Sequence, residues 1–146
     1  MSAVRNPAAA GTPAALTPEP PRPVVFEYAL VRVVPRVERG EQLNAGVLVY
    51  CRPAGLVRAE IRLDERRLLA LDPQADVEAV RAALAAVAAV CGGGAAAGQA
   101  GADDPGRRFR WLTAPRSTIV QPGPVHCGLT TDPHGEPERL LAQLVG

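Results

Sequence analysis

The residues best suited to chemistry lie in the stretch from Arg107 to Gly128. It holds four of the sixteen arginines, the single tryptophan and one of the two histidines, His126. Within it, the triplet Arg116-Ser117-Thr118 places a planar guanidinium next to two hydroxyl groups. A guanidinium binds two oxygen atoms of one phosphate or carboxylate, so the triplet is suited to a small anion.

His126 can join this triplet if the extended segments on either side of residues 121–124 pair with each other. In that pairing Ile119 lies opposite His126, and Ser117 is its diagonal neighbour. Arg116, Ser117 and His126 then surround one small anion. The candidate residues for binding an anion or another ligand are therefore Arg116, Ser117, Thr118 and His126.

Structural roles are the alternative for these residues and for a weaker group of candidates. Arg116 can pair with a core carboxylate such as Glu27 while the hydroxyls cap backbone groups. Asn44 and Gly46 suit a turn or bulge, because Asn tolerates the left-handed region and Gly permits close backbone approach; a ligand bound there is the other interpretation. The weaker candidates are Asn44, Arg32 and Glu27.

No complete catalytic constellation can be found in the sequence. All sixteen basic residues are arginine, so neither a Schiff-base lysine nor a P-loop lysine is present. Cys127 cannot readily use His126 as a base, because adjacent residues of a strand point to opposite faces. Ser117 lacks the G-x-S-x-G elbow or any other positioning motif. The sequence favours a protein that is not an enzyme, and it leaves the question open.

Metal, cofactor and nucleic-acid binding are not expected either. The three cysteines form no C-x-x-C pair, and zinc sites require closely spaced ligands. Arginines alternate with the aromatic residues Phe109 and Trp111. Proteins that bind single-stranded nucleic acid combine cationic and aromatic side chains in this way. However, strand alternation explains that pattern as core-facing rings and outward charges, and the net charge is only +1.

The composition also limits where the protein can work. Six prolines interrupt residues 1–23, so this stretch does not resemble a secretory signal. No run approaches the roughly 18 apolar residues that span a bilayer. An odd number of cysteines without a secretion signal indicates reduced thiols. We therefore expect a soluble cytoplasmic protein without membrane contact, and the excess of Ala, Gly and Arg is typical of a GC-rich bacterial genome.

The strands expected to position these residues come mainly from the first half of the chain. β-branched and aromatic runs, or clean alternation, predict long strands over residues 24–34, 45–51 and 56–63. The second of these is apolar throughout and should be a central strand covered on both faces. The alternation of residues 107–112 predicts another strand, and two short extended pieces follow at 117–120 and 125–129.

Helices are predicted where apolar residues recur at helical spacing behind a capping residue. Asp64 and Asp76 can each cap a helix, and Pro137 suits the first turn of a third. The predicted helices cover residues 64–71, 77–90 and 137–145. The chain is thus expected to be a single two-layer α+β domain over 24–146, an antiparallel sheet packed against helices. A disordered Ala/Pro-rich arm is expected over 1–23 and a flexible linker over about 92–106.

Several short sequence segments, taken in order, resemble those of a bacterial family catalogued only as domain of unknown function 3037. The resemblance extends over about residues 25 to 145, with Ala45 where family members often have valine. It implies no activity, ligand or cofactor. Genes of this family tend to lie beside genes for HipA-like kinases, which implies a kinase-like protein partner. The segments that resemble the family are residues 28–35, 43–48, 71–73, 109–112 and 115–118.

Together these observations predict a non-catalytic accessory or interaction protein, whose partner is a HipA-like kinase encoded nearby. The alternative is an enzyme or binding domain for a phosphorylated small molecule or nucleic acid. That alternative uses Arg116, Ser117 and His126.

Overall fold

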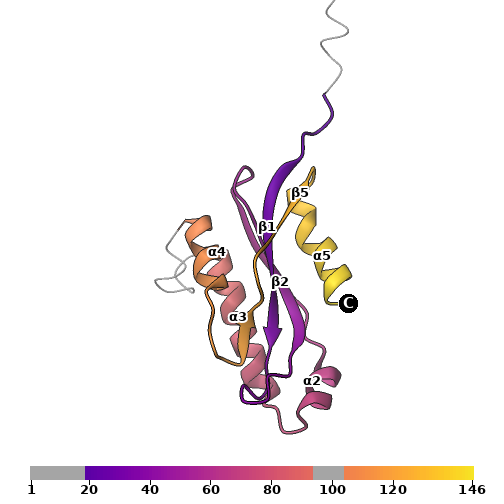
Figure 1. Ribbon diagram of the computed structural model, residues 1–146, viewed down its shortest axis with the longest axis vertical. Coiled ribbons are helices and arrows are strands. Elements are labelled where there is room, and N and C mark those ends of the chain that lie inside the picture. The colour runs from indigo at the N-terminus through magenta and orange to yellow at the C-terminus, as the bar shows by residue number, and fades with distance from the viewer. Residues whose placement is uncertain (1–18, 94–103) are drawn as a thin grey trace, which may run out of the picture.

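A computed structural model of the chain describes residues 19–93 and 104–146 (Figure 1). Most of the predicted N-terminal arm, and residues 94–103 of the predicted linker, lie outside the described residues. Residues 19–23 are exposed and belong to no helix or strand. None of the helices in the described ranges is both long enough and apolar enough to cross a membrane.

The centre of the fold is a five-stranded antiparallel sheet. The long strands β1, β2 and β3 are consecutive neighbours, as the sequence predicted. β2 is central and almost completely buried, which confirms that it is covered on both faces. The strands are β1 (Val24–Val33), β2 (Leu43–Cys51), β3 (Leu56–Ile61), β4 (Val120–Pro122) and β5 (His126–Thr130).

The two short strands share the free side of β1. β4 pairs with Val31–Val33, and β5 pairs with Val24–Tyr28. Both are antiparallel to β1, so they run in the same direction, one after the other along its edge, and do not form a hairpin with each other.

Three helices lie where the sequence predicted them. They are α2 (Glu65–Leu71), α3 (Val77–Gly92) and α5 (Glu136–Leu144). Asp64 and Asp76 cap the first two, because their carboxylates accept bonds of 3.1 and 3.0 Å from backbone N–H groups in the first turn. A short 3-10 turn, η3 (Pro133–Gly135), leads into α5.

The strand predicted over residues 107–112 is wrong, because this segment is helix α4 (Pro105–Thr113). Asp104 caps it by accepting a 2.9 Å bond from the N–H of Arg107, and Pro105 occupies the first turn. Phe109 and Leu112, three residues apart, are buried. A run of only six residues fits both the two-residue period of a strand and the 3.6-residue period of a helix. The Asp104 cap favours the helix. The predicted linker also extends too far, since α3 continues to Gly92 and α4 begins at Pro105.

Helices cover both faces of the sheet, as Figure 1 shows. On one face α2, α3 and α4 enclose a core that includes Leu48, Leu84 and Phe109. On the other face α5 packs over Phe26 and Val49. The α+β class and the antiparallel sheet packed against helices are confirmed, with the helices divided between two faces instead of forming one layer.

A β-bulge at Ala45 confirms the interpretation of the Asn44–Gly46 stretch as a turn or bulge. Val31 lies opposite Gly46 and Arg32 lies opposite Asn44, so Ala45 is the extra residue of β2. A Cβ atom on Gly46 would lie 2.6 Å from the carbonyl oxygen of Glu60. Glycine is therefore required there for β3 to approach β2.

Candidate functional site

An open groove of about 570 Å³ lies between α3, the end of α4 and the segment that leads into β4. The base of the groove includes the buried side chains of Val90 and Val120. The other residues that line it are Val37, Ala83, Ala86, Val87, Trp111, Arg116, Ser117, Thr118 and Ile119. Three of the four candidate residues for anion binding thus lie together at this groove.

Large apolar side chains are exposed around the groove. Trp111 is 47% exposed, Ile119 42% and Val37 42%. They come from three separate parts of the chain, the end of α4, the approach to β4 and the connection between β1 and β2. Apolar side chains scattered singly on a surface are ordinary, whereas several around one concavity are typical of an interaction site.

Arg116 is held at the groove by the helix that precedes it. Its guanidinium carbon lies 4.7 Å from the centre of the Trp111 ring, a cation–π contact. Its Nη2 donates to the carbonyl oxygen of Trp111 and its Nε donates to that of Ala114 at 3.3 Å. The alternative in which Arg116 pairs with Glu27 is wrong, since these contacts fix Arg116 and a different arginine binds Glu27.

Ser117 and Thr118 differ in what their hydroxyls do. The hydroxyl of Thr118 donates to the carbonyl oxygen of Val120 at 2.7 Å, which stabilises the turn into β4. The backbone N–H of Val34 donates to the carbonyl oxygen of Ile119 at 2.6 Å and joins this turn to β1. Ser117 is exposed at the rim. Thr118 therefore has the backbone role that the structural alternative assigned to it.

The groove is apolar with one cation. Arg116 is the only charged residue among those that line it, and no carboxylate in the described part of the chain lies within ion-pair distance of Arg116. A half-buried guanidinium of this kind can accept a carboxylate or phosphate from outside the chain. The arrangement can bind an apolar group and an anionic group side by side.

His126 lies elsewhere, because the strand pairing that would bring it to Ser117 does not form. It is opposite Tyr28 in β5, while Ile119 is bonded to Val34. Tyr28 and Val34, the residue that follows β1, are six residues apart, about 20 Å along an extended chain. The His126 ring instead packs against Tyr28, with centroids 5.3 Å apart. Arg116, Ser117 and His126 therefore do not surround one anion.

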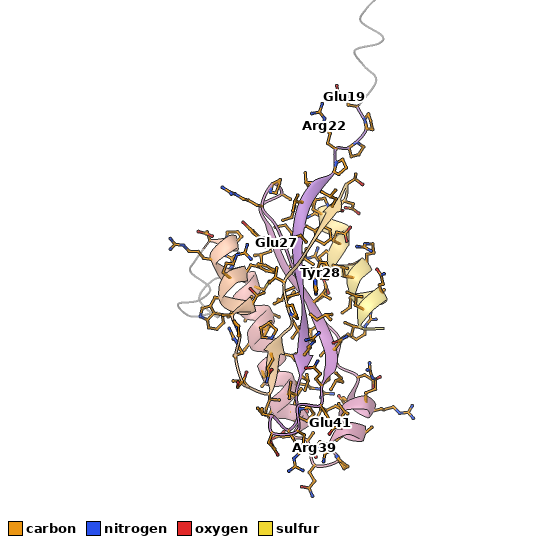
Figure 2. The ribbon with its side chains drawn as sticks, viewed as in Figure 1. Glu19, Arg22, Glu27, Tyr28, Arg39 and Glu41 are labelled. Atoms are coloured by element: carbon orange, nitrogen blue, oxygen red, sulfur yellow. The ribbon has the colours of Figure 1, made fainter. Side chains whose placement is uncertain are left out.

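Glu27 forms an ion pair with α4. Both of its carboxylate oxygens lie 2.8 Å from Nη2 of Arg110. Figure 2 shows Glu27 on the side of β1 that faces α4 and Tyr28 on the side that faces α5. The role of Glu27 in this structure is to attach α4 to the sheet.

Asn44 and Arg32, the other weaker candidates, lie opposite each other on β2 and β1. The Asn44 amide donates to the carbonyl oxygen of Leu144 at 3.2 Å, so Asn44 secures the last turn of α5. Arg32 packs against Gly123, and its buried Nε has no hydrogen-bond partner among the described residues.

Sequence reasoning missed the apolar half of the groove. The strand pattern predicts a core-facing Trp111, and nothing in the sequence marks Ile119 or Val37 as residues of a site. The alanines of α3 that form one wall carried no signal except their lack of charge. A helical interpretation of residues 107–112 would have separated Trp111 from Phe109 and shown that the tryptophan faces outward.

No three potential metal ligands converge anywhere in the two described ranges. The three cysteines are free thiols, with Cys51 and Cys91 buried and Cys127 exposed on β5. Burial raises the pKa of the Cys91 thiol to about 11. A buried thiol of high pKa is a packing residue and not a nucleophile.

Comparisons with known proteins agree with the family resemblance. No curated protein and no solved structure matches the chain. The protein-family model described as "Protein of unknown function (DUF3037)" matches residues 28–145 and includes every strand and helix described above except the first residues of β1. The chain therefore belongs to the DUF3037 family.

Proposed function

We propose that the protein is a non-catalytic accessory or interaction protein that binds a partner protein through the groove between α3, α4 and residues 116–120. The observation that carries the proposal is the grouping of Trp111, Ile119 and Val37, each more than 40% exposed, around one concavity. Aromatic side chains and arginine are enriched among the residues that dominate binding energy at protein interfaces. Trp111 and Arg116 supply both, already stacked on each other.

The occupant that fits the groove is a partner segment that combines bulky aliphatic side chains with a carboxylate. The aliphatic groups would fill the space between Val87 and Ile119. The carboxylate would pair with Arg116, whose charge no acidic residue compensates within the described ranges. Burying that guanidinium under an apolar partner without an anion would cost free energy, so an acidic residue next to the apolar ones is required.

The partner implied by the family is a HipA-like kinase encoded nearby. We propose that the pair works in the bacterial cytoplasm of an organism with a GC-rich genome. The free thiols and the all-arginine basic residues support this setting. Nucleic acid is not the proposed partner, because two of the three arginines of α4 form ion pairs. Arg110 pairs with Glu27, and Arg107 pairs with Asp104.

The test is a binding measurement with the kinase encoded beside the gene, by isothermal titration of the purified proteins. Ile119→Asp should weaken binding about tenfold or more, since it places a carboxylate in the apolar half of the groove. Leu69→Asp is the matched control, because Leu69 is a similarly exposed aliphatic residue on α2, 39% exposed and outside the groove. Equal affinity of the two variants would show that the partner binds elsewhere, and absence of binding by the native protein would reject this kinase.

A second function, binding of a phosphorylated small molecule or a nucleic acid, remains a separate proposal. It rests on Arg116 and the neighbouring hydroxyl of Ser117, now without His126. Native purification from the source cell distinguishes it from the first. A stoichiometric protein partner with protein-like absorbance supports the accessory role, while a high ratio of absorbance at 260 to 280 nm without a protein partner supports the ligand.

A further inference from the structure

Strand β5 forms an open edge of the sheet on the opposite side from β3. In the described part of the chain it pairs only with β1. Leu129 in this strand is 70% exposed, the most exposed large apolar side chain among the described residues. Its direct partner on β1, Val25, is 55% exposed. An apolar pair of this size at a sheet edge requires an explanation.

The hydrogen-bond pattern of β1 shows which backbone groups of β5 point outward. Leu30 accepts from Gly123 and Val34 donates to Ile119, so the even-numbered residues of β1 direct their backbone groups toward β4 and β5. Because these groups alternate along an antiparallel pair, residues 126, 128 and 130 of β5 bond inward to β1. The N–H and C=O groups of Cys127 and Leu129 point away from the sheet.

The two edges of the sheet differ in chemistry. β3 carries Arg58 and Glu60, which form a 2.8 Å ion pair, and Arg62 follows it directly. Charged side chains on an edge strand are a common protection against pairing with another strand. β5 has the sequence His-Cys-Gly-Leu-Thr, without acid, arginine or proline. β4, which shares the free side of β1 with β5, contains Pro122. Among the edge strands of the described ranges, β5 is therefore the one open to strand addition.

We propose that β5 pairs antiparallel with β5 of a second copy of this chain, with Gly128 on the two-fold axis, to form a symmetric dimer with one continuous sheet. In this register Cys127 lies opposite Leu129 of the second copy, and Leu129 opposite its Cys127. Each is a hydrogen-bonded pair, so all the outward N–H and C=O groups of Cys127 and Leu129 in both copies find partners. The inference is independent of the proposed groove function.

A second copy suits this edge better than an unrelated strand for two reasons. The self-complementary register uses every outward group, as an isologous two-fold interface demands. Cys127, Leu129 and Val25 also share one face of the sheet, so pairing brings the exposed apolar residues of both copies together. At the axis the two Gly128 residues face each other as a close, non-hydrogen-bonded pair, and neither carries a side chain that would contact the other.

The first test is the molar mass of the full-length protein in solution, measured by light scattering over a range of concentrations. The native chain should have twice the mass of one chain at high concentration. Leu129→Pro should return the mass to that of a monomer, because it removes an outward N–H without disturbing a bond to β1. Leu129→Val is the matched control, since it keeps the N–H and β propensity, and should remain a dimer. Ile119→Asp should also remain a dimer, which separates this interface from the groove.

The second test fixes the register and does not depend on the proline variant folding. Leu129→Cys should form disulfide-linked dimers with the native Cys127 of the second copy under mild oxidation, because directly opposed strand residues lie within disulfide range. Adding Cys127→Ser to that variant should abolish these dimers. A native chain that is monomeric at all concentrations, or a dimer that gives no disulfide in the Leu129→Cys variant, would overturn the proposal.

Discussion

At the scale of single residues, the contact between Arg116 and Trp111 determines the character of the candidate site. The guanidinium lies over the indole ring at 4.7 Å and is bound by two backbone carbonyls, so it is positioned before any ligand arrives. Preorganised cations lose less conformational entropy when they bind. Cys127 and Leu129 have the same importance on β5, where their outward backbone groups define a second surface.

Substitution of Arg116 tests whether the residue belongs to the core or to a site. Arg116→Ala should cost less than about 1 kcal/mol of unfolding free energy, because it removes a surface cation–π contact and no core ion pair. Emission from the single tryptophan should move to longer wavelength as Trp111 becomes more exposed. Thermal unfolding and fluorescence measure the two effects, with Arg116→Lys as the charge-retaining control. A variant that unfolds would indicate a structural role for Arg116.

At the scale of elements, α4 and the bulge in β2 place the parts of the site. α4 is short, and it depends on the Asp104 cap, the buried Phe109 and the ion pair between Arg110 and Glu27. Its last turn presents Trp111 to the groove. The extra residue Ala45 shifts the alternation of β2 side chains between the two faces of the sheet. Asn44 therefore lies on the face covered by α5 and contacts the end of that helix.

The bulge gives a prediction about stability. Gly46→Ala should lower the unfolding free energy by roughly 1–3 kcal/mol, because the new methyl group would lie 2.6 Å from the Glu60 carbonyl oxygen and force β3 away from β2. Gly92→Ala is the matched control, since a Cβ atom there meets nothing within 4 Å. Chemical denaturation should find the control unchanged or slightly more stable. Equal effects at both positions would contradict the close approach at Gly46.

At the scale of the whole molecule, the groove and the β5 edge are separate surfaces made by distant parts of the chain. Val37, Val87, Trp111 and Ile119 meet only because α3 and α4 pack on the same face of the sheet. β5 lies at the other end of β1 from β4. A partner in the groove and a second copy on β5 could therefore bind together.

The thiols report on the integrity of this packing. At protein concentrations low enough to keep the chain monomeric, Cys127 should react rapidly with a thiol reagent, while Cys51 and Cys91 should react only after denaturation, because both are buried. The folded pKa of Cys91, about 11, is above its ordinary value of 9.0. Its contribution to stability is therefore complete below pH 9 and is lost as the pH rises toward 11. Timed alkylation followed by mass spectrometry, and unfolding curves across this pH range, check both expectations.

The sequence by itself determined the strands and helices that carry a long periodic pattern or a clear cap. Alternation defined β3, an unbroken apolar run defined β2, and Asp64 and Asp76 marked the starts of α2 and α3. It also predicted Arg116, Ser117 and Thr118 as candidate residues, and the structure places all three at one groove. Such features are local, and their physical causes lie within a few residues of chain.

Only the tertiary structure decided what surrounds them. Residues 107–112 fit a strand or a helix equally well, and the Asp104 cap together with burial of Phe109 and Leu112 favoured the helix. His126 moved away from Ser117 because β4 and β5 each pair with β1 instead of with each other. Pairing between strands depends on contacts that are distant in sequence, and no local pattern encodes which neighbour an edge strand will choose.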